Sequence, residues 1–185
     1  PQDTQATFCA TLVDEWIRLG VRHAVVAPGS RSTPMALALA ARSELQVHVV
    51  HDEWVAGFIA LGLGLAGIPA LLLCTSGTAA ANFFPAVVEA GLSAVPMIVL
   101  TADRPPELRS VGAPQTIDQI DLYGNHTRWF HDAEIATAEA ASAWRPLAGE
   151  SFAHAAEGPV QLNLGFREPL LGTPAALPEP SDAPA

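Results

Sequence analysis

Short apolar segments that alternate with helix-like segments constrain the fold of this chain more than any other feature. Two of them, residues 70–74 and 96–101, are apolar at nearly every position. Because strand side chains point alternately to the two faces of a sheet, such strands must be covered on both faces. Further strand-like segments lie at 22–27, 47–50 and 160–164. The alternation predicts an α/β fold of three layers, in which a mostly parallel sheet has helices on both faces.

Helix-like segments fill most of the intervals between these strands. Another helix-like segment precedes the first strand, where Phe8, Leu12 and Trp16 recur at helical spacing. Residues 102–132, in contrast, are predicted to form a long polar connection without a strand, and a loop of this length in a compact domain usually serves function. Helices are expected over residues 4–19, 32–43, 54–67, 79–91 and 134–156, the last broken near Pro146.

Composition divides the chain into a folded part and a tail. Residues 1–168 are predicted to form one domain of ordinary size. After Arg167 the sequence contains five prolines and few large apolar residues. Residues 169–185 are therefore predicted to be a linker or tail toward downstream domains that the sequence does not contain.

Charge and cysteine content argue against several classes of protein. The chain has 19 acidic and 9 basic residues, a net charge of −10, and every basic residue is an arginine. Without basic clusters, an acidic chain is not expected to bind nucleic acid or a membrane surface. No apolar run approaches the ~18 residues of a membrane span, and no signal peptide is visible, so a cytoplasmic location is predicted. Cys9 and Cys74 are expected to be buried free thiols of a reducing compartment.

Four turns follow predicted strands, and ligands of parallel α/β sheets bind at the carboxyl ends of the strands. The turns are residues 28–31, 51–53, 75–78 and 101–104. A parallel sheet would bring all of them to one edge. Glu53 ends one such turn and begins a helix, so it is either a catalytic carboxylate or an exposed residue that the helix dipole favours.

Other residues of these turns also allow two interpretations. Arg31 and Arg104 are either a pair of anion clamps or solvated loop residues. Residues 76–78 (Ser-Gly-Thr) are either a plain helix cap or a loop whose backbone N–H groups face a ligand. His51 and Asp52 are not favoured as metal ligands, because contiguous side chains point in different directions.

A glycine pattern at residues 62–67 invites a further interpretation. It matches the dinucleotide-binding sequence G-x-G-x-x-G, but it lies late in a predicted helix instead of at a strand-to-helix turn. Helix glycines cost about 0.5–1 kcal/mol each relative to alanine, so close packing should offset them. We interpret them as thinning one face of helix 54–67 for another helix or subunit. A non-catalytic domain that pairs through this face is one alternative function.

Five segments share motifs with a known enzyme family. They are residues 27–34 (APGSRSTP), 51–53 (HDE), 75–79 (TSGTA), 100–108 (LTADRPPEL) and 122–126 (LYGNH). Together they resemble the N-terminal part of the MenD family of thiamine-diphosphate-dependent synthases. The glutamate after a strand is shared by thiamine-diphosphate enzymes generally, whereas the Ser-Arg-Ser-Thr and Asp-Arg-Pro-Pro-Glu-Leu sequences are much more specific to this family.

The resemblance implies a pyrimidine-binding domain, the first of three α/β domains in an enzyme that uses thiamine diphosphate and Mg²⁺. The family decarboxylates 2-oxoglutarate and adds the remaining succinyl semialdehyde unit to isochorismate in menaquinone biosynthesis. Its site lies between this domain of one subunit and the diphosphate-binding domain of another, which implies a homo-oligomer. The Gly-Asp-Gly and Asn motif for diphosphate and Mg²⁺ is missing from this sequence, so no metal ligand is assigned here and the isolated chain is expected to be inactive.

The resemblance also assigns roles to individual residues. Glu53 matches the activating glutamate, whose carboxyl group is expected to hydrogen-bond N1′ of the aminopyrimidine ring and so to favour its imino tautomer. Another thiamine-diphosphate enzyme, such as an acetolactate synthase or a 2-oxoacid decarboxylase, is the alternative among enzymes. The expected cofactor-binding residues are Glu53, Thr75, Ser76, Gly77 and Thr78, and the expected substrate-binding residues are Ser30, Arg31, Arg104 and Gln115.

Overall fold

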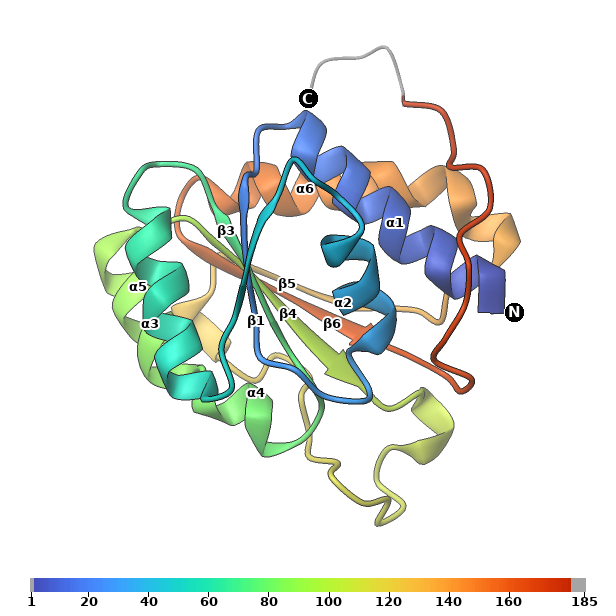
Figure 1. Cartoon of the computed structure of the whole chain (residues 1–185). Helices are drawn as coiled ribbons and strands as arrows, with labels where there is room; N and C mark the ends of the chain where they lie inside the picture. The colour runs from blue at the N-terminus through green and yellow to red at the C-terminus, as the bar shows by residue number, and fades with distance from the viewer. Residues whose placement is uncertain (1, 181–185) are drawn as a thin grey trace.

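Six strands form one parallel sheet in the computed structural model, which describes residues 2–180 (Figure 1). Their order is β2-β1-β3-β4-β6-β5, and every neighbouring pair is parallel. The strands are β1 (His23–Val26), β2 (Gln46–Val49), β3 (Ala70–Cys74), β4 (Met97–Asp103), β5 (Trp129–Ala133) and β6 (Pro159–Gly165). The helices are α1 (Gln2–Arg18), α2 (Thr33–Ala40), α3 (Glu53–Gly64), α4 (Thr78–Asn82), α5 (Phe84–Ser93) and α6 (Trp144–Ala155), with short 3₁₀ helices η1 (Pro106–Leu108), η2 (Gly124–His126) and η3 (Ala138–Ala143).

Helices cover both faces of the sheet, which confirms the predicted three-layer α/β fold. The helices α1, α2 and α6 pack on one face, and α3, α4 and α5 pack on the other (Figure 1). Within β3, Leu71 and Leu73 belong to the first core and Leu72 to the second. Strand alternation sends a continuous apolar run to both faces, so the burial of β3 requires both helical layers.

Buried polar contacts join α1 to α6. The indole Nε1 of Trp16 donates a hydrogen bond to Ser151 Oγ at 3.0 Å. Arg145 Nη1 lies 2.9 Å from the carboxylate of Glu15, and both side chains are at most 8% exposed. A buried charge is tolerated when it is paired and hydrogen-bonded. These contacts therefore fix how the two helices sit on each other.

The prediction that residues 102–132 contain no strand is wrong, because most of β5 lies within them. This strand pairs with β6 at the edge of the sheet, and four of its five residues are only half-buried. An edge strand leaves one side open to solvent and can carry polar residues such as His131 and Asp132. The composition of β5 therefore resembles that of the loop before it, and the sequence pattern did not distinguish the strand from the loop.

Two of the predicted helices are divided in the structure. The segment 79–91 corresponds to α4 and α5, and Pro85 lies in the first turn of α5, where its missing N–H is not needed. The segment 134–156 contains η3 followed by α6. The break precedes Pro146, which itself lies in the first turn of α6. In both cases proline begins a helix and does not interrupt one.

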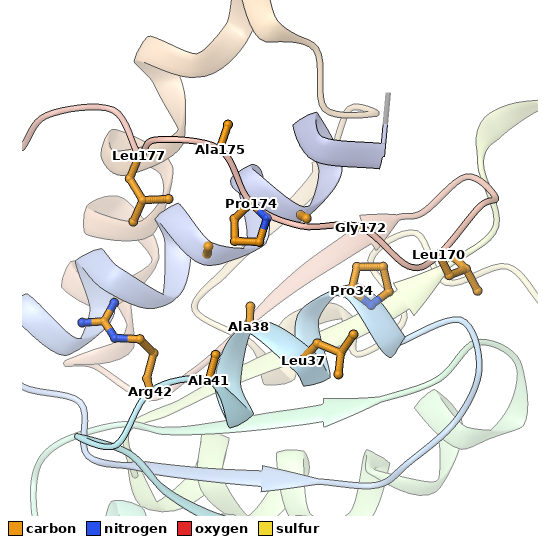
Figure 2. A pocket seen from close by; sticks show the side chains of 12 residues that line it. Pro34, Leu37, Ala38, Ala41, Arg42, Leu170, Gly172, Pro174, Ala175 and Leu177 are labelled. Atoms are coloured by element: carbon orange, nitrogen blue, oxygen red, sulfur yellow. The ribbon is translucent and has the colours of Figure 1, made fainter.

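The proline-rich tail lies along the domain as far as it is described. Residues 169–180 contain no helix or strand, and Figure 2 shows them crossing α1 and α2. Ala175 N donates to Thr7 Oγ1 at 2.8 Å, and Arg145 Nε donates to the Pro178 carbonyl at 2.7 Å. Between these contacts, residues of the tail and of the two helices line an apolar pocket of about 390 Å³. The role of the tail as a linker to downstream domains stays a prediction.

The cysteines and the helix lengths bear on two further predictions. Cys9 and Cys74 are buried and unpaired, as expected. Burial raises the pKa of both thiols above the ordinary value, so neither is a thiolate at neutral pH. Within residues 2–180, no helix is both long and apolar enough to cross a membrane.

The glycines of α3 allow close packing inside the domain. A Cβ added at Gly57 would lie 2.8 Å from the Ala86 side chain of α5, and Gly64 packs against the backbone at Pro96. Gly62, in contrast, faces open space. The close approach thus involves an internal neighbour, whereas the outer face presents large apolar side chains: Trp54, Val55, Phe58 and, just past the helix end, Leu65.

Candidate functional site

The candidate site begins where the strand order reverses. From β1 the sheet continues to β2 on one side and to β3 on the other. In parallel α/β sheets the ligand crevice is expected at such a reversal, here outside the carboxyl ends of β1 and β3. Gly29 follows β1, and Thr75 follows β3. A Cβ added at Gly29 would overlap the Thr75 side chain, so only glycine fits this approach. The hydroxyl oxygen of Thr75 is buried and has no hydrogen-bond partner among the described residues.

Gly77 completes the turn that leads from β3 into α4. Its φ of 84° lies in the left-handed region that favours glycine. A Cβ there would also lie 3.0 Å from atoms of Gln115, which belongs to the long loop after β4. The two loops therefore meet backbone to backbone at this glycine.

Glu53 lies beside this crevice at the first residue of α3. Asp52 caps the helix, because Val55 N donates to its carboxylate at 3.0 Å. Glu53 itself is half-buried, and its carboxylate has no hydrogen-bond or ion-pair partner within residues 2–180. Burial, and secondarily the charge of Glu53, raise the pKa of the Cys74 thiol. Ala56, one turn into α3, packs in the second core with Ala27 and Cys74, so the start of α3 lies beside the ends of β1 and β3.

Arg104 and Gln115 converge on Ser76. Arg104 Nη1 donates to Ser76 Oγ at 2.8 Å, and its Nη2 donates to the Pro114 carbonyl at 2.9 Å. Gln115 Nε2 donates to the Ser76 carbonyl at 3.1 Å. Arg104 and Gln115 thus meet the expected cofactor loop, although they were predicted to be substrate-binding residues.

Arg31 lies on the other side of the same edge and is only 6% exposed. Its Nη1 donates to the Phe166 carbonyl at 2.8 Å, and its Nη2 lies 3.1 Å from the carboxylate of Glu168. Its Nε is buried and unpartnered among the described residues. Burial, and then the positive charge of Arg104, lower the pKa of the Arg31 guanidinium. Two guanidinium groups at one edge of the sheet suit an anionic ligand.

Two predicted site residues, Ser30 and Thr78, are exposed, and neither side chain has a hydrogen bond to another described residue. Ser30 lies in the turn between β1 and α2, and Thr78 begins α4, so both lie at the same edge as the other residues. Within the described part of the chain, no group of three or more His, Cys, Asp or Glu side chains could hold a metal ion.

A buried polar network behind the site was missed by the sequence analysis. Asn163 Nδ2 donates to Asp103 at 2.9 Å and to Asp132 at 2.8 Å. Arg109 pairs with both of these carboxylates, at 3.0 and 2.8 Å. Gln119 Nε2 donates to Asn163 Oδ1 at 3.0 Å. The sequence feature that could have revealed this network is the pair of polar residues, Gln161 and Asn163, within the otherwise apolar segment 160–164.

The residues at this edge are compatible with thiamine diphosphate. The site offers an unpaired carboxylate at Glu53 and a buried unpartnered hydroxyl at Thr75, on turns that Gly29 and Gly77 allow to pack closely. An aminopyrimidine ring carries both donors and acceptors of hydrogen bonds, so these groups could pair with it. The fold and this edge together define a doubly wound α/β domain that binds a ligand at its switch point.

Comparison with known proteins gives the family. Residues 7–122 match the family described as "Thiamine pyrophosphate enzyme, N-terminal TPP binding domain". The chain therefore belongs to this family of thiamine-pyrophosphate enzyme domains, which confirms the predicted fold class and thiamine diphosphate as the cofactor, whereas Mg²⁺ stays a prediction.

Curated relatives include several proteins named 2-succinyl-5-enolpyruvyl-6-hydroxy-3-cyclohexene-1-carboxylate synthase. The one from Thermobifida fusca is 54% identical over 175 residues, which are 91% of this chain and 32% of the relative. The one from Bacillus velezensis is 50% identical over 177 residues, 92% of this chain and 31% of the relative. The one from Chloroflexus aurantiacus is 54% identical over 156 residues, which are 82% of this chain and 27% of the relative. The resemblance to this family is confirmed, and the chain spans about a third of its relatives' length.

Proposed function

We propose that this chain is the pyrimidine-binding domain of a thiamine-diphosphate-dependent transferase. The proposed enzyme decarboxylates 2-oxoglutarate and adds the succinyl semialdehyde unit to isochorismate. The name shared by the relatives supports this assignment. The observation that carries it is the unpaired carboxylate of Glu53, which lies beside the crevice between β1 and β3.

Glu53 and residues 75–77 are the proposed cofactor-facing groups. Thiamine diphosphate, when bound, supplies the nucleophilic carbon and the electron sink for decarboxylation. Glu53 would hold a proton at the ring nitrogen N1′, because it has no competing partner within this domain. The unpartnered hydroxyl of Thr75 could pair with the ring, the turn at Gly77 would lie beside it, and Thr78 would line the start of α4 next to them.

Arg31 and Arg104 are the proposed contacts to the substrates, which carry several carboxylates. A guanidinium group binds a carboxylate through two parallel hydrogen bonds. Arg31 is held by Glu168, whose side chain is 74% exposed, so a substrate carboxylate could take the place of this partner. Gln115 and Ser30 are exposed at the same edge and could add neutral hydrogen bonds.

The remaining parts of the active site are proposed to come from other domains. Mg²⁺ and the diphosphate group would be bound by the diphosphate-binding domain of another subunit in a homo-oligomer, so the isolated chain would be inactive. The outer face of α3 supports such packing, because Trp54, Val55 and Phe58 are exposed there. The two buried thiols suit a reducing compartment, and the cytoplasm is the proposed location.

A paired assay tests this function. The 185-residue chain and a longer polypeptide that joins it to the diphosphate-binding domain are each supplied with isochorismate, 2-oxoglutarate, thiamine diphosphate and Mg²⁺. We expect the adduct of the two substrates only from the longer polypeptide. Release of succinic semialdehyde that is unchanged by isochorismate would instead favour a 2-oxoacid decarboxylase.

Substitution of Glu53 tests the proposed proton contact. Glu53→Gln in the longer polypeptide should lower kcat by about 10²–10⁴-fold with an unchanged thermal midpoint, because an amide cannot exchange a proton with the ring. Glu89→Gln is the matched control, since this carboxylate is exposed on α5. Near-normal turnover of Glu53→Gln would refute the assignment.

A further inference from the structure

Gln119 is a buried residue, only 1% exposed, whose side chain connects the two loops of the site, which the partly buried contacts of Arg104 and Gln115 with Ser76 also join. Its Oε1 accepts a hydrogen bond from Gly77 N at 2.8 Å. Its Nε2 donates to the Ala102 carbonyl at 3.2 Å and to Asn163 Oδ1 at 3.0 Å. One carboxamide therefore joins the turn after β3 to the ends of β4 and β6.

These partners fix the orientation of the carboxamide. Gly77 offers a donor, whereas Ala102 and Asn163 offer acceptors. A rotated amide would place its NH₂ group against the N–H of Gly77 and its oxygen against two other oxygens. The backbone of Gln119 is held as well, because Gln161 Nε2 donates to its carbonyl at 3.0 Å.

The loop that contains Gln115 is anchored at its two ends. At the first end, Arg104 N donates to the Asp103 carboxylate at 2.7 Å, and Arg109 Nε donates to the Arg104 carbonyl at 2.9 Å. At the second end, Gln119 is the buried anchor. Most residues from 110 to 116 are exposed. These two anchors therefore hold the ends of the loop, while Gln115 itself contacts the Ser76 carbonyl.

We propose that Gln119 is a positioning residue of the active site. Gln119 fixes the position of the turn at Gly77 relative to the loop that contains Arg104 and Gln115. In the proposed function, that turn faces the cofactor and that loop faces the substrates. This inference rests on the function proposed above. Gln119 acts through the Gly77 amide and the loop, and it does not itself touch a reacting atom.

Gln119→Ala in the longer polypeptide removes all three side-chain hydrogen bonds. We expect the Kd for thiamine diphosphate, measured by calorimetry, and the KM for 2-oxoglutarate each to rise about tenfold, because a lost buried hydrogen bond frees both loops. We also expect faster hydrogen–deuterium exchange at the Gly77 amide. A variant that only lowers the thermal midpoint, with these three quantities unchanged, would overturn the proposal.

Ser151→Ala is the control. Ser151 on α6 is also fully buried, and its hydroxyl makes hydrogen bonds with Trp16 Nε1 and with the Ala148 carbonyl, so it contacts neither loop of the site. We expect it to lower the thermal midpoint and to leave the Kd, the KM and exchange at Gly77 unchanged. Equal effects of the two substitutions would contradict a specific role of Gln119.

Gln119→Glu provides a conservative variant. Its carboxyl group still accepts from Gly77 N, but it regains a donor for Ala102 and Asn163 only when it is protonated. The charged groups around that network are Asp103, Asp132 and Arg109. Cofactor affinity relative to the unsubstituted enzyme should therefore recover as pH falls, and Gln119→Ala should not recover.

The readouts separate this proposal from the proposed function. If the unsubstituted enzyme does not convert isochorismate and 2-oxoglutarate, the assigned reaction is wrong. Calorimetry with thiamine diphosphate and exchange at the Gly77 amide then still decide whether Gln119 positions the two loops, since neither measurement needs turnover.

Discussion

At the scale of single residues, close approach at the carboxyl edge depends on Gly29 and Thr75. The Thr75 side chain occupies the space that a Cβ at position 29 would need. Its hydroxyl oxygen is buried without a partner among the described residues. A buried polar atom without a hydrogen bond costs free energy, so this hydroxyl is a candidate for pairing with a ligand.

Gly29→Ala should displace Thr75. Overpacking of this kind typically costs about 1–3 kcal/mol, and here it falls on the ligand-facing turn. We expect a raised Kd for thiamine diphosphate in calorimetry. Gly149→Ala on α6 is the control, because a Cβ there meets open space, and it should add about 0.5–1 kcal/mol of stability. Unchanged cofactor affinity in Gly29→Ala would show that the approach is not needed.

At the scale of elements, α1 and α6 are joined by charges that are largely removed from water. Burial raises the pKa of Glu15, but the hydrogen bonds from Arg18 and Arg145 outweigh it, so the pKa of Glu15 lies below its ordinary value. A carboxylate with a depressed pKa in the folded state stabilises the fold at neutral pH. That contribution is present above about pH 4.5, the ordinary value, and is lost as pH falls through the lower pKa of the folded state.

Glu15→Gln should destabilise the domain at pH 7 by about 2–3 kcal/mol, because Arg145 loses a buried anionic partner. Thermal unfolding of both proteins between pH 7 and pH 3 measures this. The difference in thermal midpoint should shrink below about pH 4.5. Glu44→Gln, which removes an exposed partner of Arg42, should change the midpoint little. A difference that does not vary with pH would contradict the linkage.

At the scale of the whole molecule, the apolar outer face of α3 is the clearest sign of assembly. Trp54 and Phe58 pack edge to face with ring centroids 5.1 Å apart, yet they are 54% and 37% exposed. The same helix begins with Glu53. A partner that covers this face would therefore lie next to the proposed proton contact.

Phe58→Glu should weaken assembly of the longer polypeptide. A charge placed in a buried apolar interface is expected to raise the dissociation constant by about 100-fold. Sedimentation velocity over a range of concentrations measures this shift. Leu171→Glu is the control, because it adds the same charge at an exposed leucine of the tail. Unchanged sedimentation of Phe58→Glu would place the interface elsewhere.

The sequence predicted most of the fold because its strongest pattern is local. Apolar runs such as 70–74 must be buried on both faces, and the intervals between them have helical spacing, so a three-layer parallel sheet follows. The prediction failed at β5, which lies at the edge and has a polar composition. It also missed the helix boundary near Pro85, which lies in the first turn of α5, whereas the predicted break near Pro146 is confirmed by the junction of η3 and α6.

The sequence also determined which loops lie at the carboxyl edge, because strand direction in a parallel sheet fixes where each turn lies. Only the tertiary structure decided which side chains meet there. Arg104 contacts Ser76, Arg31 is held by Glu168, and Gln119 reaches Gly77, 42 residues earlier in the chain. Such contacts depend on strand order and on loops that return from a distance, and neither leaves a periodic signal in the sequence.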